Sequence, residues 1–164
     1  MKYTISAFSE NKPGVLYRIA DLFLRRKINI ESLTVSETEI HGIARFTIVV
    51  ERDEETIEKL VKQLYRIVEV TKVYEHTDNQ LLYSEIAFIK VTTKNADKRR
   101  EVSELADMFK ATIANVGPDF LVVQKAGSEE AINSLYVLLK PFGIKEFIRS
   151  GRIAMVKEGA DSIH

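Results

Sequence analysis

A loop containing Pro-Gly, set between a strand and a helix, is the feature that most constrains how this chain begins to fold. Before the loop, Tyr3, Ile5 and Ala7 alternate with polar residues, which predicts a strand with one buried face. After the loop, apolar side chains recur at helical spacing, at Val15, Leu16, Ile19, Ala20 and Phe23. The chain therefore begins with a strand, a tight loop and an amphipathic helix.

The composition of this loop favours a binding site for a small anion. Pro13 suits the first position of a helix, and Asn11 or Lys12 lies where an N-cap is expected. Gly14 allows a ligand to approach the backbone closely. The free N–H groups of the first helical turn carry partial positive charge and favour a carboxylate. An ordinary helix cap of the same composition is the alternative interpretation.

A second run, from Asn29 to Val35, follows the end of this helix. The amide of Asn29 can donate to a carboxylate and accept from an ammonium group, as an amino-acid ligand would require. Asn also tolerates left-handed backbone angles, so Asn29 could equally be a C-terminal cap. Ile30 and Leu33 are candidates for the core or for a ligand contact. Neither run contains a catalytic group.

Together the two runs carry a resemblance to a known family. Asn11-Lys12-Pro13-Gly14-Val15-Leu16 and Asn29-Ile30-Glu31-Ser32-Leu33-Thr34-Val35 are similar to the pattern of the small regulatory subunit of acetolactate synthase, whose N-terminal part is an ACT domain. The resemblance covers essentially the whole chain, and the first half is its more specific part. It implies a protein without chemistry of its own that activates a catalytic subunit and confers feedback inhibition by a branched-chain amino acid, usually valine.

The resemblance also implies a site, a set of partners and a set of cofactors. The effector-binding residues it suggests are Asn11, Pro13, Gly14, Val15, Asn29 and Ile30. The partners are the catalytic (large) subunit and a second copy of the chain, joined through the ACT domain. Thiamine diphosphate, Mg²⁺ and FAD are expected in the catalytic partner, and no cofactor is expected in this chain.

The order of elements predicts an α+β fold of two consecutive ferredoxin-like units. In the first half the expected strands and helices are Lys2–Ser9, Pro13–Arg26, Ile28–Glu37, Ile43–Val50, a helix from about Asp53, and Val68–Glu75. The polar stretch His76–Gln80 has no periodicity and is interpreted as a domain boundary. We therefore expect an ACT domain over residues 1–77 and a second α+β domain over residues 82–158.

The second half repeats this order without repeating the loop. Its expected strands are Ser84–Thr92, Ala111–Val116, Phe120–Lys125, Ile144–Arg149 and Arg152–Val156, with two helices between them. At the position equivalent to Pro13-Gly14 it has Lys94-Asn95-Ala96-Asp97, which contains no glycine. We expect no amino-acid site of the first type there.

Composition excludes several classes of function. The formal net charge is zero, which argues against nucleic acid as the main partner. The chain has no cysteine, so disulfides, thiolate chemistry and cysteine metal sites are excluded. No window is long and apolar enough to span a membrane, and no signal peptide is recognisable. We expect a cytoplasmic protein.

No catalytic or metal-binding constellation is recognisable. His41, His76 and His164 are far apart and are expected at solvated positions. The runs Asp53–Glu55 and Glu129–Glu130 are typical of helix starts, and Lys98–Arg100 is typical of a solvated helix face.

Three other interpretations remain open from the residues alone. The first is an ACT-type amino-acid sensor for a different enzyme. The second is a small ferredoxin-like enzyme such as an acylphosphatase, for which Arg18 would have to cradle a phosphate from within the first helix. The third is a metal-responsive repressor, which would need clustered His or Cys ligands and a DNA-binding arm.

Overall fold

The computed structural model describes residues 1–163 and divides into two compact units. The first unit contains Met1–Tyr83 together with the chain from Arg152 onward, and the second contains Ser84–Gly151. The division differs from the expected ranges 1–77 and 82–158, because residues 152–158 group with the first unit.

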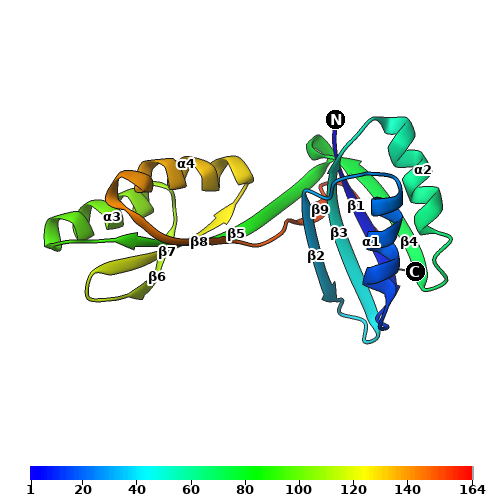
Figure 1. Ribbon diagram of the computed structural model, residues 1–164, viewed down its shortest axis with the longest axis horizontal. Helices are drawn as coiled ribbons and strands as arrows, with labels where there is room; N and C mark the ends of the chain where they lie inside the picture. Colours follow the sequence, from blue (N-terminus) through cyan, green and yellow to red (C-terminus); the bar gives the residue numbers. More distant parts are fainter. Residues whose placement is uncertain (164) are drawn as a thin grey trace. The chain divides into compact units, whose positions relative to one another are not determined.

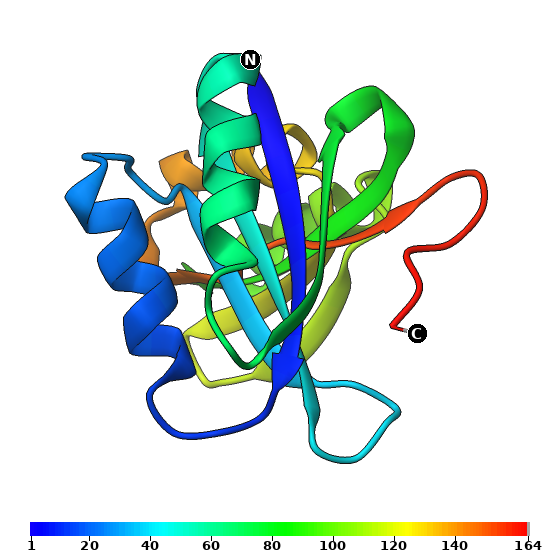
Figure 2. The ribbon, with the colours of Figure 1, turned by 90° about the vertical axis from the view of Figure 1, so that its right-hand side faces the viewer.

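The first unit is a four-stranded antiparallel sheet with two helices on one face (Figures 1 and 2). Its elements are β1 (Lys2–Glu10), α1 (Val15–Arg25), β2 (Ser32–Glu37), β3 (Ile43–Glu51), α2 (Glu54–Leu64) and β4 (Val70–Thr77). The strand order β2-β3-β1-β4 places β2 at an edge and β1 in the centre. The predicted β-α-β-β-α-β arrangement is confirmed.

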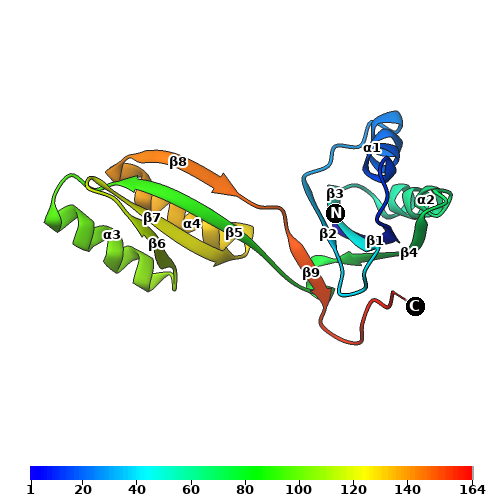
Figure 3. The same ribbon diagram turned by 90° about the horizontal axis from the view of Figure 1, so that it is seen from below.

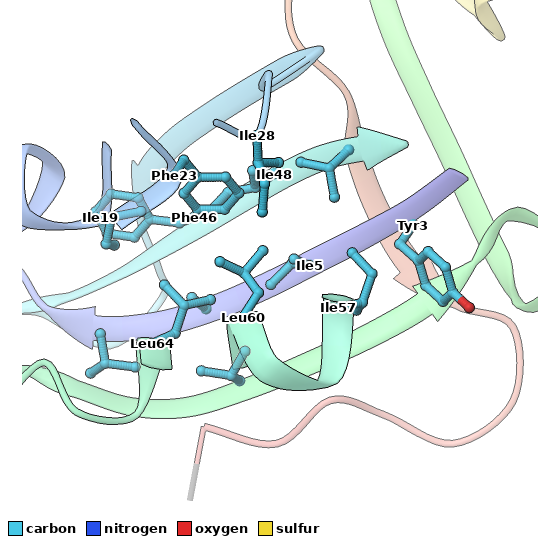
Figure 4. Close-up of a cluster of buried hydrophobic side chains, with 14 of the residues drawn as sticks. Tyr3, Ile5, Ile19, Phe23, Ile28, Phe46, Ile48, Ile57, Leu60 and Leu64 are labelled. Carbon is cyan, nitrogen blue, oxygen red and sulfur yellow. The ribbon is translucent and has the colours of Figure 1, made fainter. Parts of the chain in front are cut away.

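The core of the first unit lies between the sheet and its helices (Figure 4). Alternate residues of β1 and β3 point toward the helices, so the period of two in the sequence becomes one buried face. The helices add apolar side chains at spacings of three and four, including Ile19 and Phe23 from α1 and Leu60 and Leu64 from α2. This packing fixes α1, and with it the loop that enters α1.

The face of this sheet away from α1 and α2 carries the buried polar residues Thr4, Ser6 and Thr47 together with the buried apolar residues Phe8 and Val49. The end of the chain returns to this face, and Figure 3 shows β9 (Ile153–Val156) on the side of the sheet away from both helices. β9 pairs with β5 (Leu81–Thr92).

The second unit has the same order of elements and its own core (Figure 1). After β5 it contains α3 (Ala96–Met108), β6 (Thr112–Val116), β7 (Phe120–Gly127), α4 (Glu129–Leu139) and β8 (Ile144–Arg149), with the strand order β6-β7-β5-β8. Two short 3₁₀ turns complete the chain, η1 (Asp78–Gln80) and η2 (Lys140–Phe142). Buried residues of β5 and β7 pack against both helices of this unit.

Two sequence expectations about boundaries are corrected. The polar stretch His76–Gln80 is not the boundary, because β4 continues to Thr77, η1 follows, and the change of unit falls within β5 after Tyr83. The polar residues of this stretch do not disrupt the regular structure, because their side chains take part in local hydrogen bonds. One example is the bond from the Thr77 backbone amide to the Gln80 side chain (2.9 Å). The strand expected from Ile28 begins only at Ser32, after Lys27 takes a left-handed angle with φ of 55°.

The expected helix starts are confirmed. Asp53 caps α2 by accepting from the Thr56 amide, and Ser128 caps α4 by accepting from the Ala131 amide. Lys98–Arg100 lies in α3, where Lys98 and Arg100 pair with nearby carboxylates. None of the helices in residues 1–163 is long and apolar enough to cross a membrane.

Candidate functional site

The loop before α1 leaves the first turn of this helix uncapped by any side chain. Gly14 is the N-cap residue, with φ of 89°, and it provides no side-chain hydrogen bond. By contrast, Asp53, Asn95 and Ser128 cap α2, α3 and α4 through their side chains. Apart from a long bond from the Val15 N–H to the Lys12 carbonyl (3.5 Å), the N–H groups at the start of α1 are therefore available to an external acceptor such as a carboxylate.

Two expectations about this loop are corrected. Pro13 precedes the N-cap and is not the first helical residue, which is Val15, and neither Asn11 nor Lys12 is the cap. The reason is the left-handed conformation at Gly14, which an L-residue adopts only with strain and which moves the helix start two residues further, from Pro13 to Val15.

Hydrogen bonds attach this loop to the far end of β2. The backbone N–H of Asn11 donates to the Gly42 carbonyl over 2.8 Å, and Gly42 lies in the turn between β2 and β3. Gly42 has φ of 82°, as expected for the residue that closes this turn, and its own amide donates to the Glu37 carboxylate (2.8 Å). Asn11, Pro13 and Gly14 are exposed beside this turn.

Charged side chains surround the loop in pairs. Arg18 of α1 donates to Glu69 at 2.5 Å, and this bond holds the pKa of the Glu69 carboxyl below its usual range. Lys12 forms an ion pair with Glu10, which raises the pKa of the Lys12 ammonium. Arg18 is thus engaged with a carboxylate and does not form a phosphate cradle. The sequence analysis missed Glu69, because its partner is 51 residues away and no local pattern links the two.

The remaining predicted residues divide between the surface and the core. Asn29 is exposed and is not a helix cap, because α1 ends with Arg26 as C-cap and Lys27 takes the left-handed angle. Ile30 is partly buried and packs against the core. The Val15 side chain is 2% exposed and belongs to the core, so only the Val15 backbone lies at the loop.

Within one chain the two halves of the candidate site lie at opposite ends of β2. Asn29 and Ile30 lie three and two residues before Ser32, which pairs with Val49 of β3 near the start of β1. The loop at Asn11 lies beside Gly42, beyond the last residue of β2. A strand of six residues spans about 20 Å, so one bound amino acid cannot reach both ends.

Exposed apolar side chains gather at this edge of the sheet. Leu33 and Val35 of β2 are 37% and 41% exposed, and they pair with the core residues Ile48 and Phe46 of β3 on the helix side. Tyr17 and Leu24 of α1 are each 73% exposed. An edge strand with partly exposed apolar side chains has the character of a surface that pairs with another chain.

The two histidines that the structure describes, His41 and His76, do not form a metal site. Among residues 1–163, no group of three or more His, Cys, Asp or Glu side chains is placed to hold a metal ion. His76 is not solvated as expected, since its ring lies 3.0 Å from a carboxylate oxygen of Asp161 and its side chain is 18% exposed. His41 is exposed, and His164 lies outside the described residues.

Comparison with known proteins identifies relatives over nearly the whole chain. A family model for the AHAS small subunit-like ACT domain matches residues 5–72, and one for the small subunit of acetolactate synthase matches residues 84–158. The probable acetolactate synthase small subunit of Archaeoglobus fulgidus is 43% identical, over 96% of this chain and 98% of its own. The acetolactate synthase small subunit of Bacillus subtilis is 40% identical, over 96% of this chain and 91% of its own.

A solved structure is similar over the same extent. The crystal structure of the acetolactate synthase small subunit from Thermotoga maritima aligns with a TM-score of 0.89 and 32% identity, covering 98% of this chain and 99% of its own.

Proposed function

This chain belongs to the family of acetolactate synthase small subunits, and we propose that it is a valine-sensing regulatory subunit of that enzyme. In this proposal the chain raises the turnover of a catalytic large subunit and makes that turnover sensitive to valine. It has no catalytic residue of its own.

The observation that carries the proposal is the position of the two half-sites at opposite ends of an exposed edge strand. If two copies pair β2 against β2 about a two-fold axis, the strands run antiparallel. The Asn29 end of one strand then lies beside the Asn11 and Gly14 end of the other. One pairing therefore completes two equivalent sites, each with residues from both chains.

The chemistry of such a site suits an amino acid with an apolar side chain. The uncapped N–H groups at the start of α1 favour the effector carboxylate. The Asn29 and Asn11 amides can accept from its ammonium group. Ile30 and the apolar residues of the β2 edge provide a surface for a branched side chain. These features support an amino-acid effector, and valine is the choice that the family suggests.

The reaction itself is assigned to the partner. In this proposal thiamine diphosphate, Mg²⁺ and FAD bind to the catalytic subunit, and this chain acts only through its assembly with that subunit. Valine can lower activity only if it binds the less active assembly more tightly than the active one. By reciprocity, the catalytic subunit must then change the valine affinity of the small subunit.

A paired measurement tests the proposal. Acetolactate formation is assayed for the catalytic subunit alone, with this chain, and with this chain plus valine, while calorimetry gives the valine affinity with and without the catalytic subunit. We expect activation, inhibition by valine and two different affinities. Acetolactate production by this chain alone would contradict the assignment, and valine-sensitive activity with identical affinities would contradict the coupling.

A further inference from the structure

A buried arginine outside the candidate site holds the start of β2. Arg152 is 6% exposed, and one nitrogen of its guanidinium donates to Asp78 (2.7 Å) and to Thr4 (3.1 Å). The guanidinium carbon lies 3.8 Å from the centre of the Tyr83 ring. The backbone N–H of Arg152 donates to the Ser32 hydroxyl over 2.9 Å. Three hydrogen bonds and one ring contact therefore fix this residue.

These contacts cross the sheet in a single row. Ser32 of β2 pairs with Val49 of β3, and Val49 pairs with Thr4 of β1. Arg152 bonds to both ends of this row, at Ser32 and at Thr4. It thereby connects the edge strand to the central strand, independently of the backbone ladder.

The edge strand needs such a connection more than the central strands do. β1 is hydrogen-bonded to a strand on each side, whereas β2 is bonded on one side only, to β3. Asn29 and Ile30 lie three and two residues before Ser32, and the hydrogen bond from the Glu31 backbone amide to the Val49 carbonyl (2.9 Å) is the adjacent connection to the sheet. A segment that is already ordered binds its ligand more tightly, because less conformational freedom is lost on binding.

We propose that Arg152 and Ser32 are positioning residues for the effector segment at Asn29 and Ile30. The inference rests on the proposed function for the identity of the effector, but the ordering of the segment is a property of the chain without effector. Arg152 directly follows Gly151, the last residue of the second unit. The chain that leaves the second unit is therefore anchored at the start of β2.

The same returning segment has a second anchor, whose side-chain hydrogen bonds go to β1 and β9 rather than to β2. Arg45 of β3 donates to the Ala154 carbonyl (2.8 Å) and to the Ser6 hydroxyl of β1 (3.0 Å). Ser6 and Ser32 are thus matched hydroxyls, each accepting one bond in the network that fastens residues 152–163. Only Ser32 belongs to the edge strand, so Ser6 provides a control for general loosening of the segment.

The first experiment measures amide hydrogen exchange of the full-length chain without effector, for the wild type, Ser32→Ala and Ser6→Ala. We expect Ser32→Ala to speed exchange of the Glu31 amide about threefold to tenfold, the size expected for loss of one hydrogen bond, with no change in the β1–β3 ladder. Ser6→Ala should leave the Glu31 amide unchanged. Equal exchange of this amide in the two variants would overturn the proposal.

The second experiment measures valine affinity and the activation of the catalytic subunit for the same variants, with Arg152→Gln, Arg152→Lys and Arg45→Gln. We expect Ser32→Ala to weaken valine binding about threefold to tenfold while activation without valine is retained. Arg152→Gln should weaken valine binding further, Arg152→Lys should recover part of the loss, and Arg45→Gln should change it less than about twofold.

The outcomes separate the two proposals. Faster Glu31 exchange in Ser32→Ala with wild-type valine affinity would overturn the role of this residue in effector binding. No valine binding by the wild type would contradict the proposed function, and the exchange experiment would still decide whether Ser32 orders the segment. If Arg152→Gln does not fold, Ser32→Ala and Ser6→Ala decide the matter alone.

Discussion

The two units have the same order of strands and helices, but they differ in how the first helix begins and in how the other face of the sheet is covered. In the first unit Gly14 leaves α1 uncapped, whereas in the second the Asn95 side chain accepts from the Lys98 amide at 2.8 Å and caps α3. The outer face of the first sheet is fastened to the returning segment through Arg45 and Arg152. On the second sheet Phe88 of β5 is 42% exposed.

This difference shows that the same fold can begin its first helix in two ways, with and without a side-chain cap. Both loops connect the first strand of a unit to its first helix, yet only one leaves backbone N–H groups without a side-chain acceptor. In the proposed function, effector binding therefore depends on a few loop residues, and the shared sheet-and-helix core provides their position. The predictions below compare a change in the first unit with a matched change in the second.

The largest effect is expected from a charge on the edge strand of the first unit. Val35→Glu places a carboxylate near its own symmetry mate in the proposed β2 pair, where like charges repel and lose water. We expect the dimer dissociation constant to rise more than about tenfold by analytical ultracentrifugation, with valine binding lost in parallel. Val116→Glu on β6, which is also an edge strand, should leave the dimer intact. Equal dissociation by both variants would refute the pairing through β2.

The next largest effect is expected at the uncapped helix. Gly14→Asp places a carboxylate where the effector carboxylate belongs, at a cost of roughly 1–4 kcal/mol depending on the effective dielectric. A Cβ atom at Gly14 would meet no atom within 4 Å, so the fold should persist despite the strain at φ of 89°. Calorimetry should show valine binding weakened at least about tenfold.

The control for this change is Ala96→Asp at the start of α3, where a negative charge favours the helix and we expect no effector to bind. It should leave valine affinity unchanged. Normal valine binding by folded Gly14→Asp would show that the site lies elsewhere.

Two asparagines are expected to affect different properties, Asn29 the affinity for valine and Asn95 the stability of the second unit. Asn29→Ala removes an exposed amide and should weaken valine binding by about 1 kcal/mol with little change in melting temperature. Asn95→Ala removes the cap of α3 and should destabilise the second unit by about 1 kcal/mol without changing valine affinity. Melting curves and calorimetry on both variants check this, and a loss of stability in Asn29→Ala equal to that in Asn95→Ala would contradict it.

The smallest effect concerns acid stability. Arg18 lowers the pKa of Glu69 in the folded first unit, and Lys145 lowers the pKa of Asp119 in the second. A carboxyl with a folded pKa below its unfolded value stabilises the protein above the unfolded pKa, about 4 for these groups, and this stabilisation is lost as the pH falls through the folded pKa.

Each unit offers one substitution to test this. Arg18→Gln and Lys145→Gln should each reduce the slope of melting temperature against pH below about pH 4.5, and NMR titration should show the pKa of the partner carboxyl returning toward its ordinary value. An unchanged Glu69 titration in Arg18→Gln would show that this pair does not set the pKa.

Local patterns were sufficient for most of the fold. Alternation in β1 and β3 and helical spacing in α1 and α2 predicted the element order, because these periodicities follow directly from backbone geometry. The acidic starts of α2 and α4 were also predictable, since an N-cap needs only a side chain within its own turn.

Contacts between distant residues were not predictable in the same way. Arg152 and Thr4 are separated by 148 residues, and nothing near Arg152 indicates that the chain returns to the first sheet. The same holds for His76 and Asp161, 85 residues apart, which is why His76 was expected at a solvated position. In the candidate site, the residue types were read from the sequence, whereas their separation along β2 required the strand register.

The most direct test of the account is complementation between two defective chains. Gly14→Asp and Asn29→Ala are purified separately, mixed under conditions that allow subunits to exchange, and titrated with valine. If each site takes its loop from one chain and its Asn29 from the other, a mixed dimer has one site with both changes and one with neither. Random exchange should then restore about one quarter of the wild-type number of sites at wild-type affinity. A mixture in which no site recovers wild-type affinity, although mixed dimers form, would place each site within a single chain and contradict the account.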